Sequence, residues 1–247
     1  MPRAKDGALV DEVTDRLAFE IASGVYAPGD RLPPVRELAA RHGLNPSTVQ
    51  VVVARLRTAG FIESSGSRRG GLVVRDVEEL GGVDTWRYVF RFAQRLPERA
   101  IKLFEGFLST RRILVIEVVK KLSAHPDAYD LAPLRREVER LRHLAESHPD
   151  PERFARAELK AARLMLRLVD EPVLLSLYNT IGEVLLEVPA VLQAMYREPT
   201  FNVAMWTSLV EAWEHGEAVP GAIETADRAL AAFHETCVGR FRALVSA

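Results

Sequence analysis

Apolar residues recur with a helical period in the first part of the chain. Every fourth position is apolar over residues 8–23, which predicts one amphipathic helix that buries Leu9, Val13, Leu17 and Ile21. A Pro28-Gly29 turn separates this helix from a second, shorter one. Pro34 is expected to open the second helix and Gly43 to close it.

A third helix and a hairpin follow. Asn45 is a strong N-cap residue and Pro46 suits the first helical position, so a helix is expected from there to about Ala59, where Gly60 stops it. Residues 61–64 and 72–75 alternate in polarity around a glycine-rich segment, which predicts a two-stranded hairpin. Three helices followed by such a hairpin are typical of a winged helix-turn-helix, a domain that binds DNA.

The rest of the chain shows only helical spacing. Helices are expected over residues 84–95, 98–123, 130–147, 151–169, 172–194, 201–215 and 221–244, and Pro189 either kinks or splits one of them. The pattern therefore predicts a mainly α protein with two domains. These are a winged helix-turn-helix over 1–76 and an all-helical bundle over 84–247, with a linker over 77–83 around Gly81-Gly82.

Charge is distributed unevenly although the total is only −1. Residues 31–75 contain eight arginines against two glutamates, a local charge of +6 that leaves −7 on the remainder. A basic segment that coincides with a helix-turn-helix pattern indicates DNA binding.

Composition sets few other limits. The single cysteine, Cys237, excludes an internal disulfide and is typical of a reducing cytoplasm. No stretch approaches the ~20 apolar residues that a membrane span needs, and the N-terminus has no apolar segment of a signal peptide. We therefore expect a cytoplasmic protein without a membrane partner.

The expected DNA contacts lie at the start of the third helix and in the wing. The second helix of a helix-turn-helix reads the major groove with its first residues, and Gln50 can bond adenine there. Arginines in a glycine-flanked wing suit a narrow minor groove. The candidate DNA-binding residues are Arg36, Asn45, Ser47, Thr48, Gln50, Arg68, Arg69, Gly70 and Gly71. Asn45 can equally act only as a helix cap.

This segment resembles the GntR family of bacterial transcription regulators. The matching residues are Pro28-Gly29-Asp30-Arg31-Leu32-Pro33, Arg36-Glu37-Leu38-Ala39, Ser47-Thr48-Val49, Leu56, Gly60-Phe61-Ile62 and the glycine-rich wing. The helical remainder resembles the ligand-sensing domain of the FadR branch, in Phe107–Arg111, His125-Pro126, Glu171-Pro172 and His234-Glu235-Thr236. The family often has arginine where this chain has Pro46 and Gln50, so its usual operator sequence is not implied.

The resemblance also bears on the ligand. Many relatives hold a divalent metal with one acid and three histidines, but Leu159, Arg163 and Trp206 stand at the expected positions, with only His234 in place. We therefore expect neither a metal nor another cofactor. The acyl-CoA sensors of the branch imply a ligand near Arg111, Glu235 and Thr236, although Phe233 replaces a glycine and Arg240 a tryptophan.

The residues themselves suggest further pocket positions. Arg163 lies in an apolar segment, and a buried guanidinium needs an anionic ligand or a partner such as Glu158 or Glu235, unless it reaches the surface. Aromatic residues such as Tyr178 and Trp206 can line an acyl pocket or simply fill the core. The candidate effector-binding residues are Arg111, Arg163, Tyr178, Trp206, His234, Glu235 and Thr236.

Together these observations favour a homodimeric, DNA-binding transcription regulator. Its partners are expected to be a double-stranded operator and a metal-free effector such as an acyl-CoA, a fatty acid or another organic acid. Two alternatives stay open: an effectorless dimeric DNA-binding protein and a metal-dependent carboxylate sensor. An enzyme is disfavoured, because no catalytic arrangement of residues is recognisable.

Overall fold

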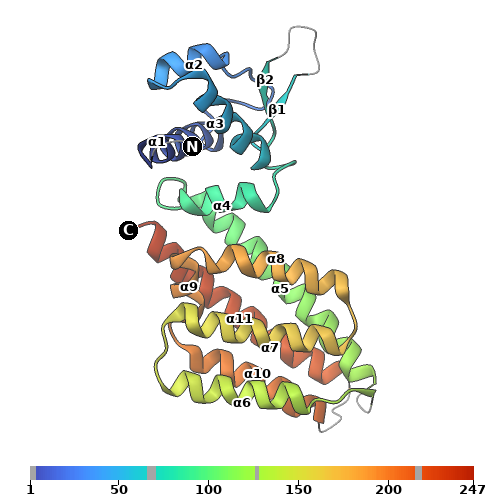
Figure 1. The fold of residues 1–247 in the computed structure, drawn as a ribbon. Coiled ribbons are helices and arrows are strands. Elements are labelled where there is room, and N and C mark those ends of the chain that lie inside the picture. The colour runs from blue at the N-terminus through green and yellow to red at the C-terminus, as the bar shows by residue number, and fades with distance from the viewer. Residues whose placement is uncertain (1–3, 66–70, 126–127, 215–218) are drawn as a thin grey trace. The chain divides into compact units, whose positions relative to one another are not determined.

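The N-terminal helices form where the apolar spacing predicts them. The computed structural model describes residues 4–65, 71–125, 128–214 and 219–247. Helix α1 (Ala4–Ala22) packs against α3 (Pro46–Thr58), and α3 packs against α2 (Val35–His42) (Figure 1). Gly43 takes a left-handed φ of 64° after α2, a conformation that favours glycine. The helices enclose a core with Leu17, Leu38, Leu56 and Phe61 at its centre.

A short antiparallel hairpin completes this arrangement. Strand β1 (Ile62–Ser64) pairs with β2 (Leu72–Val74), with Glu63 opposite Val73. Arg31 forms an isolated bridge to Val73, which ties the segment before α2 to the wing. The predicted winged helix-turn-helix and the mainly α fold class are therefore confirmed.

Helix α4 (Val83–Arg91) differs from the expected domain division. The chain divides into two compact units, Met1–Leu96 and Pro97–Ala247, here called the N-terminal unit and the helical unit. The sequence analysis assigned residues 77–83 to a linker and the next helix to the C-terminal domain. In the structure, Phe92 meets Phe19 edge to face at 5.4 Å, and the Thr85 hydroxyl donates to the Ala59 carbonyl at 2.5 Å. These contacts join α4 to the N-terminal unit.

The helical unit consists of long helices packed side by side (Figure 1). Helix α5 (Pro97–Ala124) packs along α11 (Val219–Val245), and α6 (Ala132–Glu146) packs against both α7 (Pro151–Leu168) and α10 (Pro199–Glu214). Helix α8 (Pro172–Leu186) covers α7, and α9 (Pro189–Tyr196) contacts α7 and α11. The unit has its own core, so each unit buries apolar side chains independently.

Pro189 splits the helix that the sequence pattern extended over residues 172–194. Helix α8 ends at Leu186 and α9 begins at Pro189, with a bend of 105° between them. Proline has no backbone N–H for the helical ladder and disfavours a helical conformation in the residue before it. Val188 is accordingly extended, with φ −113° and ψ 99°. The bend directs α9 back toward α11 and closes one end of the bundle.

Candidate nucleic-acid interface and a buried carboxylate

Asn45 organises the start of α3. Its side-chain oxygen accepts three hydrogen bonds, from the Thr48 amide at 2.8 Å, the Thr48 hydroxyl at 2.8 Å and the Ser47 hydroxyl at 2.6 Å. The helical hydrogen bonds begin only with Val49, whose amide donates to the Asn45 carbonyl at 3.2 Å. Asn45 therefore acts as a helix cap, and it orients two hydroxyls at the N-terminal end of α3. The positive end of the helix dipole at this point favours an anion.

The outward face of α3 combines polar and apolar side chains. Ser47 and Gln50 are exposed, as predicted DNA contacts must be, and Arg36 is exposed on α2. Val51 is 47% exposed, an unusual solvent position for a β-branched side chain. Valine and alanine methyl groups can contact the thymine methyl in the major groove. Val51 and the neighbouring exposed Ala54 are thus possible base contacts that the sequence analysis missed, although their spacing opposite the buried residues of α3 signalled them.

Several arginines of the basic segment already have acidic partners. Arg41 pairs with Glu37, Arg55 with Asp11 of α1, and Arg75 with Glu63 at 3.7 Å. Arg57 donates to the Ser64 hydroxyl at 2.8 Å. Within the described residues, the exposed side chains of Arg31 and Arg36 have no ion-pair or hydrogen-bond partner. These two arginines are consequently the described cations of the segment most available to phosphate or base edges.

The wing is described only at its base. The Ser65 amide donates to the Gly71 carbonyl at 2.9 Å, and Gly71 has a φ of 121°, a conformation that L side chains rarely adopt. Gly71 therefore closes the hairpin, as its place in the predicted wing requires. The predicted contacts Arg68, Arg69 and Gly70 lie outside the described residues.

We expect Asn45→Ala to lower the free energy of unfolding of the N-terminal unit by about 1 kcal/mol, because the substitution removes the oxygen that caps α3. Asn45→Asp retains that oxygen and is the matched control. Chemical denaturation followed by amide exchange in α3 measures the effect. Equal stability of the alanine variant and the wild type would contradict the assigned capping role.

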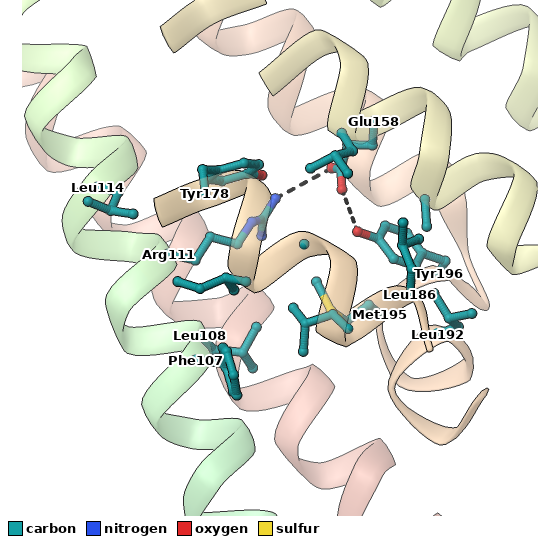
Figure 2. Close-up of a pocket in the computed structure, with 15 residues that line it drawn as sticks. Phe107, Leu108, Arg111, Leu114, Glu158, Tyr178, Leu186, Leu192, Met195 and Tyr196 are labelled. Carbon is teal, nitrogen blue, oxygen red and sulfur yellow. Dashed lines mark hydrogen bonds and ion pairs between the residues drawn. The ribbon is translucent and has the colours of Figure 1, made fainter. Parts of the chain in front are cut away.

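A buried carboxylate lies at the centre of the helical unit. Glu158 of α7 is only 1% exposed. Its Oε1 accepts from Asn202 Nδ2 at 3.1 Å and Trp206 Nε1 at 3.1 Å, and its Oε2 accepts from the Tyr196 hydroxyl at 2.8 Å. Arg111 Nη2 approaches Oε1 at 3.5 Å (Figure 2). Glu158 thus connects α7 to α5, α9 and α10.

Arg111 and two tyrosines surround this carboxylate in the apolar interior (Figure 2). Burial lowers the pKa of Arg111, but Glu158 and Tyr178 more than offset it, so the pKa lies above its usual value and the side chain stays charged. Burial, followed by the nearby Glu158 carboxylate, raises the pKa of Tyr196 well above its ordinary value. The Tyr196 hydroxyl therefore keeps its proton and remains a hydrogen-bond donor.

A small cavity adjoins Arg111. Its volume is about 40 Å³, and it is lined by this polar group together with apolar residues such as Phe107, Leu186 and Met195. Such a space holds a few water molecules and is too small for an acyl chain. Gly182 of α8 lies so close to α7 that a Cβ atom there would stand 2.8 Å from the Leu159 side chain. Helices α7 and α8 are therefore tightly packed at this point.

Three predicted effector residues gather at this site. Arg111 and Tyr178 line the cavity, and Trp206 binds the carboxylate. Three others do not line it: Glu235 and Thr236 are exposed on α11, and His234 is half-buried there. The adjacent Phe233 is buried and stacks on Phe201 at 5.6 Å.

Arg163 does not occupy the interior that its apolar neighbours suggested. It donates to Asn179 Oδ1 at 2.6 Å and pairs with Glu183 at 3.2 Å, on a side chain that is 33% exposed. Glu158, five residues earlier on α7, points inward instead.

The sequence analysis missed Tyr196 and Asn202 and treated Glu158 only as a partner for Arg163. Asn202 and Trp206 are four residues apart, so both reach one face of α10, but nothing in the local pattern indicates a shared acceptor on α7. Within the described residues, no group of three or more histidine, cysteine, aspartate or glutamate side chains is arranged to bind a metal ion.

No single helix in the described ranges has the length and apolar character to cross a membrane. Taken together, α8 and α9 are long and apolar enough for a membrane span, by length and composition only, but they form a bent pair.

The arrangement of the N-terminal unit defines a winged helix-turn-helix, in which the second helix of the motif enters the major groove. Residues 9–74 match the family model of bacterial regulatory proteins, gntR family. This segment is a helix-turn-helix domain of the GntR family, as the sequence predicted. The assignment of the helical unit to the FadR branch stays a prediction.

Curated relatives include helix-turn-helix transcriptional regulators. The uncharacterized HTH-type transcriptional regulator Rv0494 of Mycobacterium tuberculosis is 44% identical over 77 residues, which cover 30% of this chain and 31% of that protein. The HTH-type transcriptional regulator Mce2R of M. tuberculosis is 30% identical over 125 residues, 50% of this chain and 49% of that protein. The chain thus spans about half or less of these relatives. Both are named as transcriptional regulators, in agreement with the expectation that the chain is not an enzyme.

A solved structure extends the likeness in fold to both units. Lar, which controls the expression of the Listeria monocytogenes agr system, matches with a TM-score of 0.51 and 16% identity. The match covers 95% of this chain and 97% of that chain. The shared fold therefore includes the helical unit.

Proposed function

We propose that this protein is a transcription regulator that binds double-stranded operator DNA through its N-terminal unit. The observation that carries the proposal is the exposed face at the start of α3, with Ser47 and Gln50, together with the exposed Arg36 of α2, inside a GntR-family domain. The positive end of the α3 dipole there suits phosphate, and Gln50 suits adenine. Such a protein acts where the DNA is, in the bacterial cytoplasm.

Selection of bound sequences from a pool of random duplexes tests this function. The full chain is expected to enrich a palindromic sequence with two half-sites about one helical turn apart, since a two-fold dimer presents two identical heads. Enrichment of no sequence, or of single half-sites only, would count against an operator-binding dimer.

The proposed homodimer has a suitable surface on α8 and α5. Helix α8 is rich in apolar residues, yet only Val184 among them is fully buried. Val173 is 66% exposed and Leu177 is 50% exposed. Ile113 on the adjoining helix α5 is 68% exposed. A second copy of the chain would remove these side chains from water, and the dimer would supply the two-fold symmetry that the operator requires.

We expect Leu177→Glu to raise the dissociation constant of the dimer at least about tenfold, because the interface would have to desolvate a carboxylate. Leu244→Glu is the matched control, since Leu244 is 42% exposed on α11. Analytical ultracentrifugation measures both. If the dimer weakens only with the control, the interface lies elsewhere.

We further propose that an organic acid, bound without metal near Arg111, controls operator binding. A buried guanidinium beside a tyrosine and an apolar wall suits a carboxylate with an apolar tail. An acyl-CoA or a fatty acid requires the helices around the cavity to move apart, because the cavity of about 40 Å³ is too small for an acyl chain. The same small cavity favours a second candidate, a regulator without an effector.

A thermal-shift screen against acyl-CoAs, fatty acids and small carboxylates separates these two candidates. An effector that prefers the folded state raises the melting temperature. A rise in melting temperature with an acid that disappears in Arg111→Ala supports the acid sensor. No shift with any acid supports the regulator without an effector.

A further inference from the structure

We infer that the helical unit contains a carboxylate-binding site and that the chain's own Glu158 occupies it. Donors from helices α5, α9 and α10 form the site, and the Glu158 carboxylate of α7 binds there as a ligand supplied by the chain itself. The geometry alone supports this assignment, whereas its consequence for regulation rests on the proposed function.

The donors around Glu158 form a complete anion site. Arg111 comes from α5, Tyr196 from the end of α9, and Asn202 and Trp206 from α10. All four are cationic or neutral donors, and they reach both oxygens of the carboxylate. Proteins bind free carboxylates with the same donor types. The Glu158 side chain is contributed by α7 and inserted among donors from three other helices.

The four contacts differ in length. The neutral donors lie 2.8–3.1 Å from the carboxylate oxygens, while Arg111 Nη2 lies 3.5 Å away. The Arg111 guanidinium also lies 5.2 Å from the centre of the Phe233 ring. Arg111 therefore makes the longest of these contacts, and it borders the cavity. An acid that enters the cavity meets Arg111 and competes with Glu158 for it.

The internal ligand has a large advantage in this competition. Glu158 is held beside Arg111 by the fold, and such a tethered group behaves as if present at a high effective concentration. Small carboxylates should therefore bind the wild type poorly. Only an acid whose apolar part gains enough from the leucine-rich walls can replace Glu158 at Arg111.

The regulatory consequence is a bundle that is complete without an effector. Glu158 itself ties four helices together, so the chain's own groups favour one defined packing of the helical unit. An acid that takes Arg111 from Glu158 breaks one of these connections and favours another packing. The concentration of effector needed to change the packing thus depends on how strongly Glu158 holds Arg111.

Chemical rescue tests the assignment. Glu158→Ala removes one methylene and the carboxylate, the equivalent of acetate, and leaves the donors around an empty space. In the full-length variant, saturating sodium acetate is expected to raise the melting temperature by about 5 °C relative to equal sodium chloride. The wild type should shift by less than about 1 °C under the same conditions.

One further variant and one further carboxylate serve as controls. Arg111→Gln combined with Glu158→Ala removes the cation and should abolish the acetate effect. Isobutyrate, which is larger than the deleted group, should stabilise Glu158→Ala less than acetate does. If Glu158→Ala does not fold in chloride, its refolding yield in acetate replaces the melting temperature as the readout.

Equal responses of Glu158→Ala and the wild type to acetate would overturn the inference. So would an acetate effect that persists without Arg111. Absence of operator binding by the wild type would instead refute the proposed function. Operator binding is measured separately with the selected duplex. Rescue by acetate would stand in that case, because it reports only on the helical unit.

Discussion

Replacement of Glu158 by alanine is expected to lower the free energy of unfolding of the helical unit by about 3–5 kcal/mol. The reason is that Arg111, itself 7% exposed, would keep its charge in an apolar interior without a counter-charge. Asn202, Trp206 and Tyr196 would lose their acceptor at the same time. Urea denaturation of the full chain measures the loss.

Two controls separate the buried charge from general damage. Arg111→Met combined with Glu158→Ala removes both charges and should recover at least about 1 kcal/mol relative to Glu158→Ala. Glu183→Ala breaks a more exposed pair with Arg163 and should cost less than about 1 kcal/mol. A Glu158→Ala variant no less stable than Glu183→Ala would show that the carboxylate is not a structural centre of the bundle.

The second large effect is expected at the DNA interface. Arg36→Ala combined with Gln50→Ala should lower affinity for the selected operator at least about thirtyfold, since each lost contact costs about 1–3 kcal/mol. Both side chains are exposed, so the folded N-terminal unit should be unaffected. Fluorescence anisotropy with a labelled duplex measures the affinity.

The matched control is Arg156→Ala, which removes an exposed arginine of the helical unit. Operator binding should not change in this variant. The single variants distinguish two roles: a phosphate contact by Arg36 reduces the salt dependence by about one unit of slope, whereas a base contact by Gln50 relaxes sequence preference at one position. Unchanged operator affinity in the double variant would remove α3 and α2 from the DNA interface.

Local signals were sufficient for the N-terminal unit. The four-residue spacing of Val13 and Leu17, the Asn45 cap and the Gly43 stop are all properties of neighbouring residues, and the structure has each of them in place. The affiliation of α4 depended on Phe92 meeting Phe19, residues far apart in the sequence. Periodicity carries no information on such a pairing, so the linker was predicted before α4 and not after it.

The buried site shows a second limit of sequence reasoning. Arg111 and Tyr178 were predicted, one from family resemblance and the other from bulk, and both line the cavity. Arg163 was expected inside because its neighbours are apolar. Helix α7 instead turns Glu158 into the interior and leaves Arg163 on the flank beside Glu183. The two positions are five residues apart, which is about 140° around a helix, and tertiary packing decides which of them faces the core.

The central claim is that this chain recognises a specific DNA sequence. Anisotropy titrations of the wild type against the selected operator and against a scrambled duplex of equal composition, at physiological salt, test it directly. The account predicts that the operator binds at least about a thousandfold more tightly than the scrambled duplex. Affinities that agree within a few fold would contradict it and leave only non-specific attraction between phosphate and the basic segment.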